Sequence, residues 1–251
     1  LLDYAPPQAE RIYVGKASSD HTLPQADINR LLVEKAQQGK TVVRLKGGDP
    51  FVLGRGGEEA LALAEAGIPF QIVPGITSAI AVPAYAGLPV THRGMAAGFA
   101  VYTGHKECQD SGSTFQAEGS GLQEQRETWN VERGTVIFLM GVKNLAEIVS
   151  SLLADGGAPD TPVALIRWGT TTRQKTVTGT LQTIIRKAEE AALTPPAILV
   201  VGKVVELRDT LNWFEQRPLF GKTMVITRTR EGASGLAERL ADLGAECLEF
   251  P

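Results

Sequence analysis

The sequence predicts an α/β protein, and three observations support this prediction. Buried-type apolar runs alternate with helical patterns over residues 1–92, which is the signature of a parallel sheet with covering helices. The strand-like run TVVRL (41–45) leads directly into a glycine-rich turn, a place where α/β proteins often bind ligands. The 251 residues, 43% hydrophobic and 21% charged, suffice for one large or two modest cores.

The first part of the chain holds three predicted strands and three predicted helices. Short apolar, β-branched runs predict strands at 11–14, 41–45 and 70–73. Helical spacing predicts helices over 26–39 and 58–66 and from residue 76 onward, the last kinked or ended by Pro83.

The second part repeats the alternation with longer apolar runs. It predicts strands at 98–104, 135–141, 162–168, 175–179 and 197–207. Asn144 and Glu147 resemble a capping pair before one helix, and Thr180 is the predicted cap of a helix over 180–192. Residues 106–134 are polar and poor in aliphatic side chains, so we expect a mobile insertion there.

The pattern restarts after the stretch QRPLFG (216–221). A strand at 223–229, a helix at 233–244 and a strand at 245–250 form the opening of a new βαβ unit. Because the chain starts at LLDY without a Met or a cap, and stops at a strand end, we expect it to be a piece of a longer polypeptide.

Composition excludes several classes of function. A net charge of −3 offers no basic face for nucleic acid, and no apolar run is long enough to span a bilayer. Cys108 and Cys247 lie far apart and make no metal-spaced pair, so we predict no metal and expect free thiols in a cytoplasmic protein.

The glycine-rich stretch LKGGDPFVLGRGGEEA (45–60) matches neither of two common nucleotide-binding loops. No Lys-Ser or Lys-Thr follows the glycines, as a phosphate-binding loop requires, and GxGxxG lacks its last glycine. A ligand-binding turn and a plain tight turn are both compatible with this stretch alone.

Five motifs occur in one order: GGDPFVLGRGGEE (47–59), VPGITSAIAVPAYAGLPVTHRG (73–94), YTGHK (102–106), FLMGVKNL (138–145) and RWGTTTRQ (167–174). With GKASSDHTLPQADIN (15–29), they closely resemble uroporphyrinogen-III C-methyltransferases of the tetrapyrrole methylase superfamily. The resemblance covers residues 10 to about 215. Residues 221–251 resemble the start of uroporphyrinogen-III synthase, so the parent protein is expected to be bifunctional.

The resemblance implies two α/β domains with the methyl donor, S-adenosylmethionine, in the cleft between them, in a homodimer. We expect an N-terminal methylase domain over 1–93, a C-terminal one over 94–216 and a synthase fragment over 217–251. The reaction implied is two methyl transfers to uroporphyrinogen III, giving precorrin-2 for sirohaem and cobalamin.

The resemblance also implies site residues. The predicted donor contacts are Gly47, Gly48, Asp49, Val52, Thr77, Ser78, Met140 and Gly169. From the residues alone, Thr77 and Ser78 are equally typical of a helix cap, and Met140 of a core. The three histidines, His21, His92 and His105, receive no role.

Proton handling in the family is attributed to a lysine and an aspartate. Lys16 matches the lysine. The aspartate has no counterpart, since Asp3 lies on the wrong side of the motif, so we expect this chain as given to be catalytically impaired.

The eight carboxylates of the substrate call for cationic partners. The candidates are Arg44, Lys46, Arg55, Arg93 and, at the start of the polar insertion, Lys106. Two alternatives stay open: another transferase of the superfamily, and a non-catalytic module beside the synthase domain.

Overall fold

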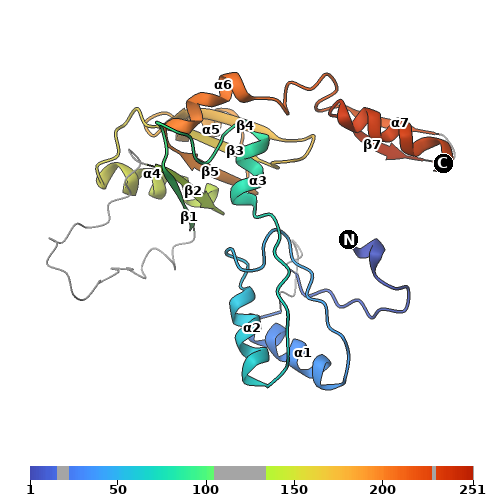
Figure 1. The fold of residues 1–251 in the computed structure, drawn as a ribbon. Coiled ribbons are helices and arrows are strands. Elements are labelled where there is room, and N and C mark those ends of the chain that lie inside the picture. Colours follow the sequence, from blue (N-terminus) through green and yellow to red (C-terminus); the bar gives the residue numbers. More distant parts are fainter. Residues whose placement is uncertain (16–22, 105–133, 228–229, 251) are drawn as a thin grey trace, which may run out of the picture. The chain divides into compact units, whose positions relative to one another are not determined.

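The computed structural model describes residues 1–15, 23–104, 134–227 and 230–250 (Figure 1). Its contacts divide the chain into two compact units, residues 1–77 and 78–251, and each is described by itself. Lys16, His21 and nearly all of the predicted insertion at 106–134 lie outside the described residues. Within the described part, no helix combines the length and apolarity needed to cross a membrane.

The first unit contains two α-helices that pack against each other. After a short 3-10 helix (η1, Leu2–Tyr4) come α1 (Gln25–Gln37) and α2 (Gly56–Glu65). Helix α1 buries Ile28 and Leu32, which are four residues apart and therefore share one face. Both helices confirm the sequence prediction to within a few residues.

The three strands predicted in the first unit were wrong. Residues 11–14, 41–45 and 70–73 form no ladder with another described segment, and strands exist only where such ladders do. Their apolar side chains stay in solvent: Val43 is 82% exposed and Val73 is 73% exposed. The parallel sheet predicted for residues 1–92 is therefore absent from the described part of this unit.

The second unit is built on a five-stranded sheet. Its elements, in chain order, are α3 (Ser78–Tyr85), β1 (Gly98–Thr103), β2 (Gly134–Leu139), η3 (Val142–Asn144), α4 (Leu145–Ala154), β3 (Pro162–Arg167), β4 (Lys175–Thr180), α5 (Ile184–Glu190), β5 (Ala197–Val201), η4 (Lys203–Leu207) and α6 (Arg208–Leu211). The strand order is β1-β2-β5-β3-β4, with β1 and β2 parallel and the other neighbours antiparallel.

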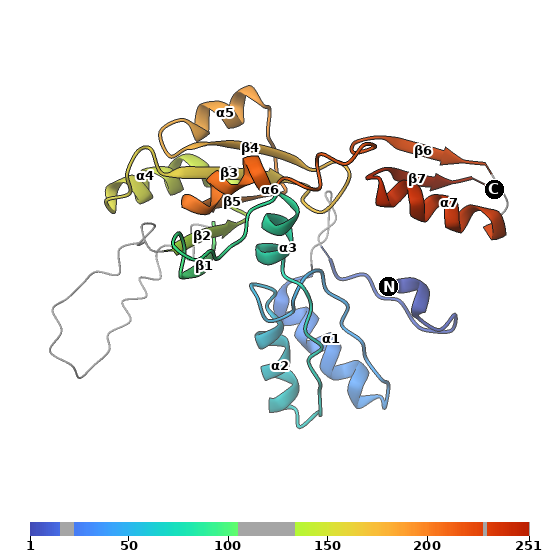
Figure 2. The same ribbon diagram turned by 45° about the horizontal axis from the view of Figure 1, so that its top comes forward.

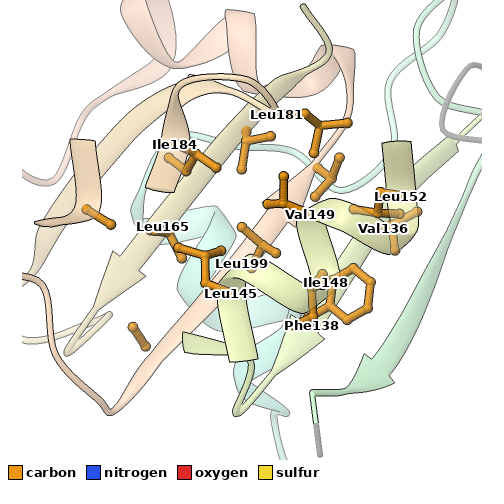
Figure 3. Packing of buried hydrophobic residues seen from close by; sticks show 14 of the residues in the cluster. Val136, Phe138, Leu145, Ile148, Val149, Leu152, Leu165, Leu181, Ile184 and Leu199 are labelled. Carbon is orange, nitrogen blue, oxygen red and sulfur yellow. The ribbon is translucent and has the colours of Figure 1, made fainter. Parts of the chain in front are cut away.

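Alternate residues of the three central strands face two different cores. One core joins Phe138, Leu165 and Leu199 to the apolar faces of α4 and α5 (Figure 3). The next residues along each strand pack with α3 on the other face (Figure 2). The continuous apolar runs of the sequence are explained by this two-sided burial.

Several predicted boundaries needed correction. The long strand predicted at 197–207 ends at Val201, because Gly202 adopts a φ of 138° and η4 follows. Thr180 belongs to β4 and does not cap a helix; α5 begins four residues later, after Thr183. Pro83 lies inside α3, which ends two residues beyond it.

Asn144 occupies the N-cap position of α4 but makes no side-chain cap hydrogen bond. Its amide nitrogen donates instead to the Gly104 carbonyl, at 2.5 Å. The Asn144 half of the predicted capping pair with Glu147 is therefore wrong, because this amide joins the residue after β1 to the start of α4.

The last segment forms the predicted βαβ unit. Strands β6 (Thr223–Ile226) and β7 (Glu246–Glu249) pair in parallel, connected by α7 (Arg230–Asp242).

We predict that Leu165→Ala lowers the free energy of unfolding by about 2–5 kcal/mol, because it leaves a cavity in the core of the second unit. Leu165 is fully buried. The matched control is Leu61→Ala, since Leu61 is 65% exposed and should change stability by less than about 0.5 kcal/mol. Urea denaturation followed by circular dichroism measures both. Equal losses would contradict the assigned core.

Candidate functional site

The glycine-rich turn before α2 is a compact loop with two different glycine requirements. Gly48 has a φ of +70°, a conformation that side chains rarely adopt. Gly47 has no such constraint, and an added Cβ there would meet no protein atom within 4 Å. Steric contacts within the described part of the first unit therefore do not require a glycine at position 47. The exposed backbone of Gly47 is accessible to a ligand on the side where a Cβ would stand.

The Asp49 side chain fastens this turn to a second loop. One carboxylate oxygen accepts a hydrogen bond from the Phe51 amide (2.8 Å), and the other accepts from the Gly75 amide (3.0 Å). The bond from Gly75 and then the bond from Phe51 lower the pKa of Asp49 below its ordinary value of 3.8. Asp49 thus holds together the GGDP and PGIT segments, both predicted to contact the donor.

The two loops approach each other at backbone distance. A Cβ built on Gly75 would lie 2.2 Å from the Gly48 carbonyl oxygen, so any side chain at Gly75 would force the loops apart. Thr77 lies two residues after Gly75. Helix α3 begins at the next residue, the exposed Ser78. Val52, a further predicted donor contact, is 37% exposed and so remains accessible.

Two predicted substrate-binding residues already have an acidic partner. Arg44 Nε and Lys46 Nζ both donate to Glu59 Oε1, at 3.2 and 2.8 Å. The Gln25 amide adds a third bond to the same oxygen at 3.3 Å. Glu59 is only 5% exposed, so this cluster is the buried polar anchor of the first unit. The sequence did not predict this cluster. Glu58 and Glu59 are adjacent on α2, and the pairing depends on their side chains pointing in different directions.

Arg55 also pairs with a carboxylate. Its guanidinium makes two bonds to Glu58, at 2.8 and 2.9 Å, and this contact lowers the pKa of Glu58. Both side chains are about half exposed, so a competing carboxylate can reach the guanidinium.

Arg93 lies in the second unit, in the loop 91–97 closed by an isolated bridge between His92 and Ala96. This loop lines an open pocket of about 620 Å³.

Two of the predicted donor contacts, Met140 and Gly169, follow strands that end at the same edge of the sheet. Strands β2 and β3 are both antiparallel to β5, so they run in the same direction. Phe138 is level with Leu199 and Arg167 with Ala197, which places Met140 and Arg167 at the same height on either side of β5. Met140 is 49% exposed with a φ of 60°, so it is a surface residue of the edge and not a core residue.

The turn after β3 is strained and firmly held. Trp168 and Thr170 have positive φ values of 48° and 69°. The buried Gln174 side chain accepts a bond from the Thr170 amide (2.8 Å) and donates to the Tyr85 carbonyl (3.2 Å) and to Glu215 (2.8 Å). A Cβ on Gly169 would lie 2.3 Å from Val82, so this glycine is required by packing on α3 whether or not a ligand is present.

The sequence profile described as Tetrapyrrole (Corrin/Porphyrin) Methylases matches residues 1–185 of this chain. The chain belongs to this family. The mixed α/β architecture of the chain agrees with this family. The structure of a uroporphyrin-III C-methyltransferase from Thermus thermophilus, complexed with S-adenyl homocysteine, superimposes on this chain with a TM-score of 0.61. That structure is 36% identical and covers 80% of each chain.

Two curated relatives of this tetrapyrrole methylase are similar over most of the sequence. A protein of Methanosarcina barkeri, named S-adenosyl-L-methionine-dependent uroporphyrinogen III methyltransferase, is 52% identical over 86% of this chain and 81% of its own. A uroporphyrinogen-III C-methyltransferase of Bacillus subtilis is 46% identical over the whole chain and 50% of its own length. The chain thus spans about half the length of the first curated relatives it matches.

Within the described ranges, no three His, Cys, Asp or Glu side chains gather in a way that would hold a metal ion.

We predict that the Gly75 amide proton of this methylase reports the charge of Asp49. The pKa of Asp49 is lowered in the folded state, so the clamp is fully present above the ordinary value of 3.8 and is lost as pH falls through the lowered value. In NMR spectra the Gly75 amide shift should titrate with a midpoint below 3.8. Asp49→Asn should abolish this titration; a midpoint at or above 3.8 in the natural sequence would contradict the clamp.

We predict that Glu59→Ala destabilises the first unit by about 3–5 kcal/mol, because it leaves two buried or half-buried cations unpaired. The matched control is Glu58→Ala, which removes an exposed pair and should cost less than about 1 kcal/mol. Chemical denaturation measures both. A loss of similar size in the two variants would show that Glu59 is not the anchor.

Proposed function

We propose that this protein transfers methyl groups from S-adenosylmethionine to two pyrrole carbons of uroporphyrinogen III, giving precorrin-2 for sirohaem and cobalamin. The supporting observation is the 52% identity to the Methanosarcina barkeri enzyme over 86% of the chain. The donor is supported by the Thermus thermophilus structure with S-adenyl homocysteine, the demethylated donor.

We propose that the donor contacts the residues named from the sequence. In the first unit these are Gly47, Gly48, Asp49, Val52 and Thr77; in the second they are Ser78, Met140 and Gly169. The geometry suits this role, since Gly47 has open space beside its backbone and Met140 and Val52 expose apolar surface.

The chemistry requires alignment and a proton acceptor. The donor supplies an electrophilic methyl: a carbon–carbon bond forms to the pyrrole carbon while the sulfur–methyl bond breaks and its electron pair stays on sulfur. The protein has to orient that carbon, and the loops clamped by Asp49 supply a rigid surface for this. The carbon then loses its proton to a base, a role we propose for Lys16.

We propose that Arg55 and Arg93 bind substrate carboxylates. Arg93 makes no ion pair with another described residue, and the exposed Arg55–Glu58 pair can open. Arg44 and Lys46 are poorer candidates than the sequence suggests, because releasing them would leave Glu59 buried and unpaired.

The domain limits 1–93, 94–216 and 217–251 stay proposals, as do a homodimer, a cytoplasmic location and a bifunctional parent. The parallel β6–α7–β7 unit supports assigning residues 217–251 to the start of a synthase-type domain. Size-exclusion chromatography with light scattering on the natural full-length protein measures the oligomeric state.

The proposed activity predicts that the natural protein adds two methyl groups to uroporphyrinogen III, visible by mass spectrometry after oxidation. Asp49→Ala should weaken calorimetric binding of S-adenosylhomocysteine by at least tenfold, because the two loops lose their clamp. Binding without any methylation of this tetrapyrrole would favour another transferase of the family. Neither binding nor transfer would favour a non-catalytic module.

The proposed carboxylate contacts predict a salt-dependent Michaelis constant for the tetrapyrrole, since exposed charge pairs weaken as ionic strength rises. Arg55→Ala should raise this constant and reduce its salt dependence. An unchanged constant in the variant, over the same salt range, would remove Arg55 from the substrate site.

A further inference from the structure

Trp168 carries two arginine side chains at the edge of the five-stranded sheet. The Arg167 guanidinium carbon lies 3.9 Å from the centre of the Trp168 ring, and that of Arg173 lies 4.8 Å from it. Such contacts stabilise a cation over an aromatic face and leave the in-plane N–H groups of the guanidinium available.

Among the described residues, these two guanidiniums have no acidic partner, which sets them apart from three of the candidate substrate-binding cations. Arg44, Lys46 and Arg55 all pair with glutamates, whereas neither Arg167 nor Arg173 forms a side-chain ion pair or hydrogen bond with a described residue. The Arg167 Nε is also shielded from solvent without a hydrogen-bond partner. A buried, unsatisfied charged donor is costly, so within the described residues the Arg167 guanidinium lacks the internal compensation that Glu59 gives to Arg44 and Lys46.

The pair lies beside two of the donor contacts proposed in the second unit, Met140 and Gly169. Arg167 ends β3, directly before Trp168 and Gly169, and it is level with Met140 across β5. Both arginines therefore lie at the edge where the second unit presents its predicted donor contacts.

The turn that carries the pair is rigid. Gln174, which follows Arg173, is buried and bonds to Thr170, Tyr85 and Glu215. The Thr171 hydroxyl donates to the Trp168 carbonyl at 2.7 Å. Less conformational entropy is then lost when a ligand binds, because the turn is already ordered.

We propose that Arg167 and Arg173, held on Trp168, form a carboxylate-binding site, a role that the resemblance did not give to either arginine. The proposal deepens the proposed function and rests on it for the identity of the ligand. Two sources offer the same chemistry: a carboxylate of the tetrapyrrole and the amino-acid carboxylate of the methyl donor. A planar guanidinium binds either one through two parallel hydrogen bonds.

The test uses the natural full-length protein with Arg167→Gln and Arg173→Gln, separately and together. The matched control is Arg186→Gln, which removes an exposed arginine on α5. We expect each site variant to raise the Michaelis constant for uroporphyrinogen III by about tenfold, the loss of one charge-assisted contact, with a much smaller change in kcat. Arg167→Lys, which keeps the charge but not the fork, should be intermediate.

Calorimetry with S-adenosylhomocysteine separates the two sources. An unchanged Kd with a raised Michaelis constant assigns the site to the tetrapyrrole, and a weakened Kd assigns it to the donor. If all variants match the Arg186→Gln control in both measurements, the proposal is overturned.

A separate measurement keeps the inference distinct from the proposed function. Uroporphyrin III, the oxidised macrocycle with the same eight carboxylates, can be bound directly and followed by quenching of tryptophan fluorescence. Binding that weakens in Arg167→Gln and Arg173→Gln supports a carboxylate site even if the protein methylates no tetrapyrrole. If neither uroporphyrin III nor S-adenosylhomocysteine depends on the two arginines, no carboxylate site exists there.

Discussion

The pairing of β5 with two antiparallel neighbours is the constraint on which the second unit depends. All five residues of β5 are buried, so the strand cannot shift register without moving apolar side chains between the two cores. Because β2 and β3 both oppose β5, they share one direction, and the turns that follow them reach the same edge of the sheet. Met140 and Gly169, far apart in sequence, are thereby brought to the same edge of the sheet.

The described part of the first unit is held by a different means. Two carboxylates each join separate segments: Asp49 joins the turn after residue 46 to the loop at Gly75, and Glu59 joins α2 to Arg44, Lys46 and the start of α1. Around them much apolar surface stays exposed, including Val43 and Val73. Order here therefore rests on these polar contacts together with the small apolar contact between α1 and α2.

Local pattern predicted most of the second unit. Continuous apolar runs predicted β1, β2 and β3 to within two residues. For β2 and β3, burial on both faces explains this strong signal in the sequence. The errors arose where one residue redirects the chain, as Gly202 does after β5, or where pairing was assumed without a partner, as at 41–45. The Glu59 cluster was not predictable, because tertiary structure brings its side chains together. The Arg167–Trp168–Arg173 stack is local in sequence, but it depends on a turn with positive φ values at Trp168 and Thr170 that the residue pattern does not reveal.

The contact between Gly48 and Gly75 limits how these two loops can diversify. The two loops touch through backbone atoms, with no room for even a methyl group at Gly75. A surface made of main chain has nearly the same shape whatever the neighbouring sequence, so selection has little to adjust there. Gly48 and Gly75 are each required for a separate reason, the positive φ at Gly48 and the missing Cβ at Gly75, so variation on this surface has to arise at positions that present side chains, such as Val52.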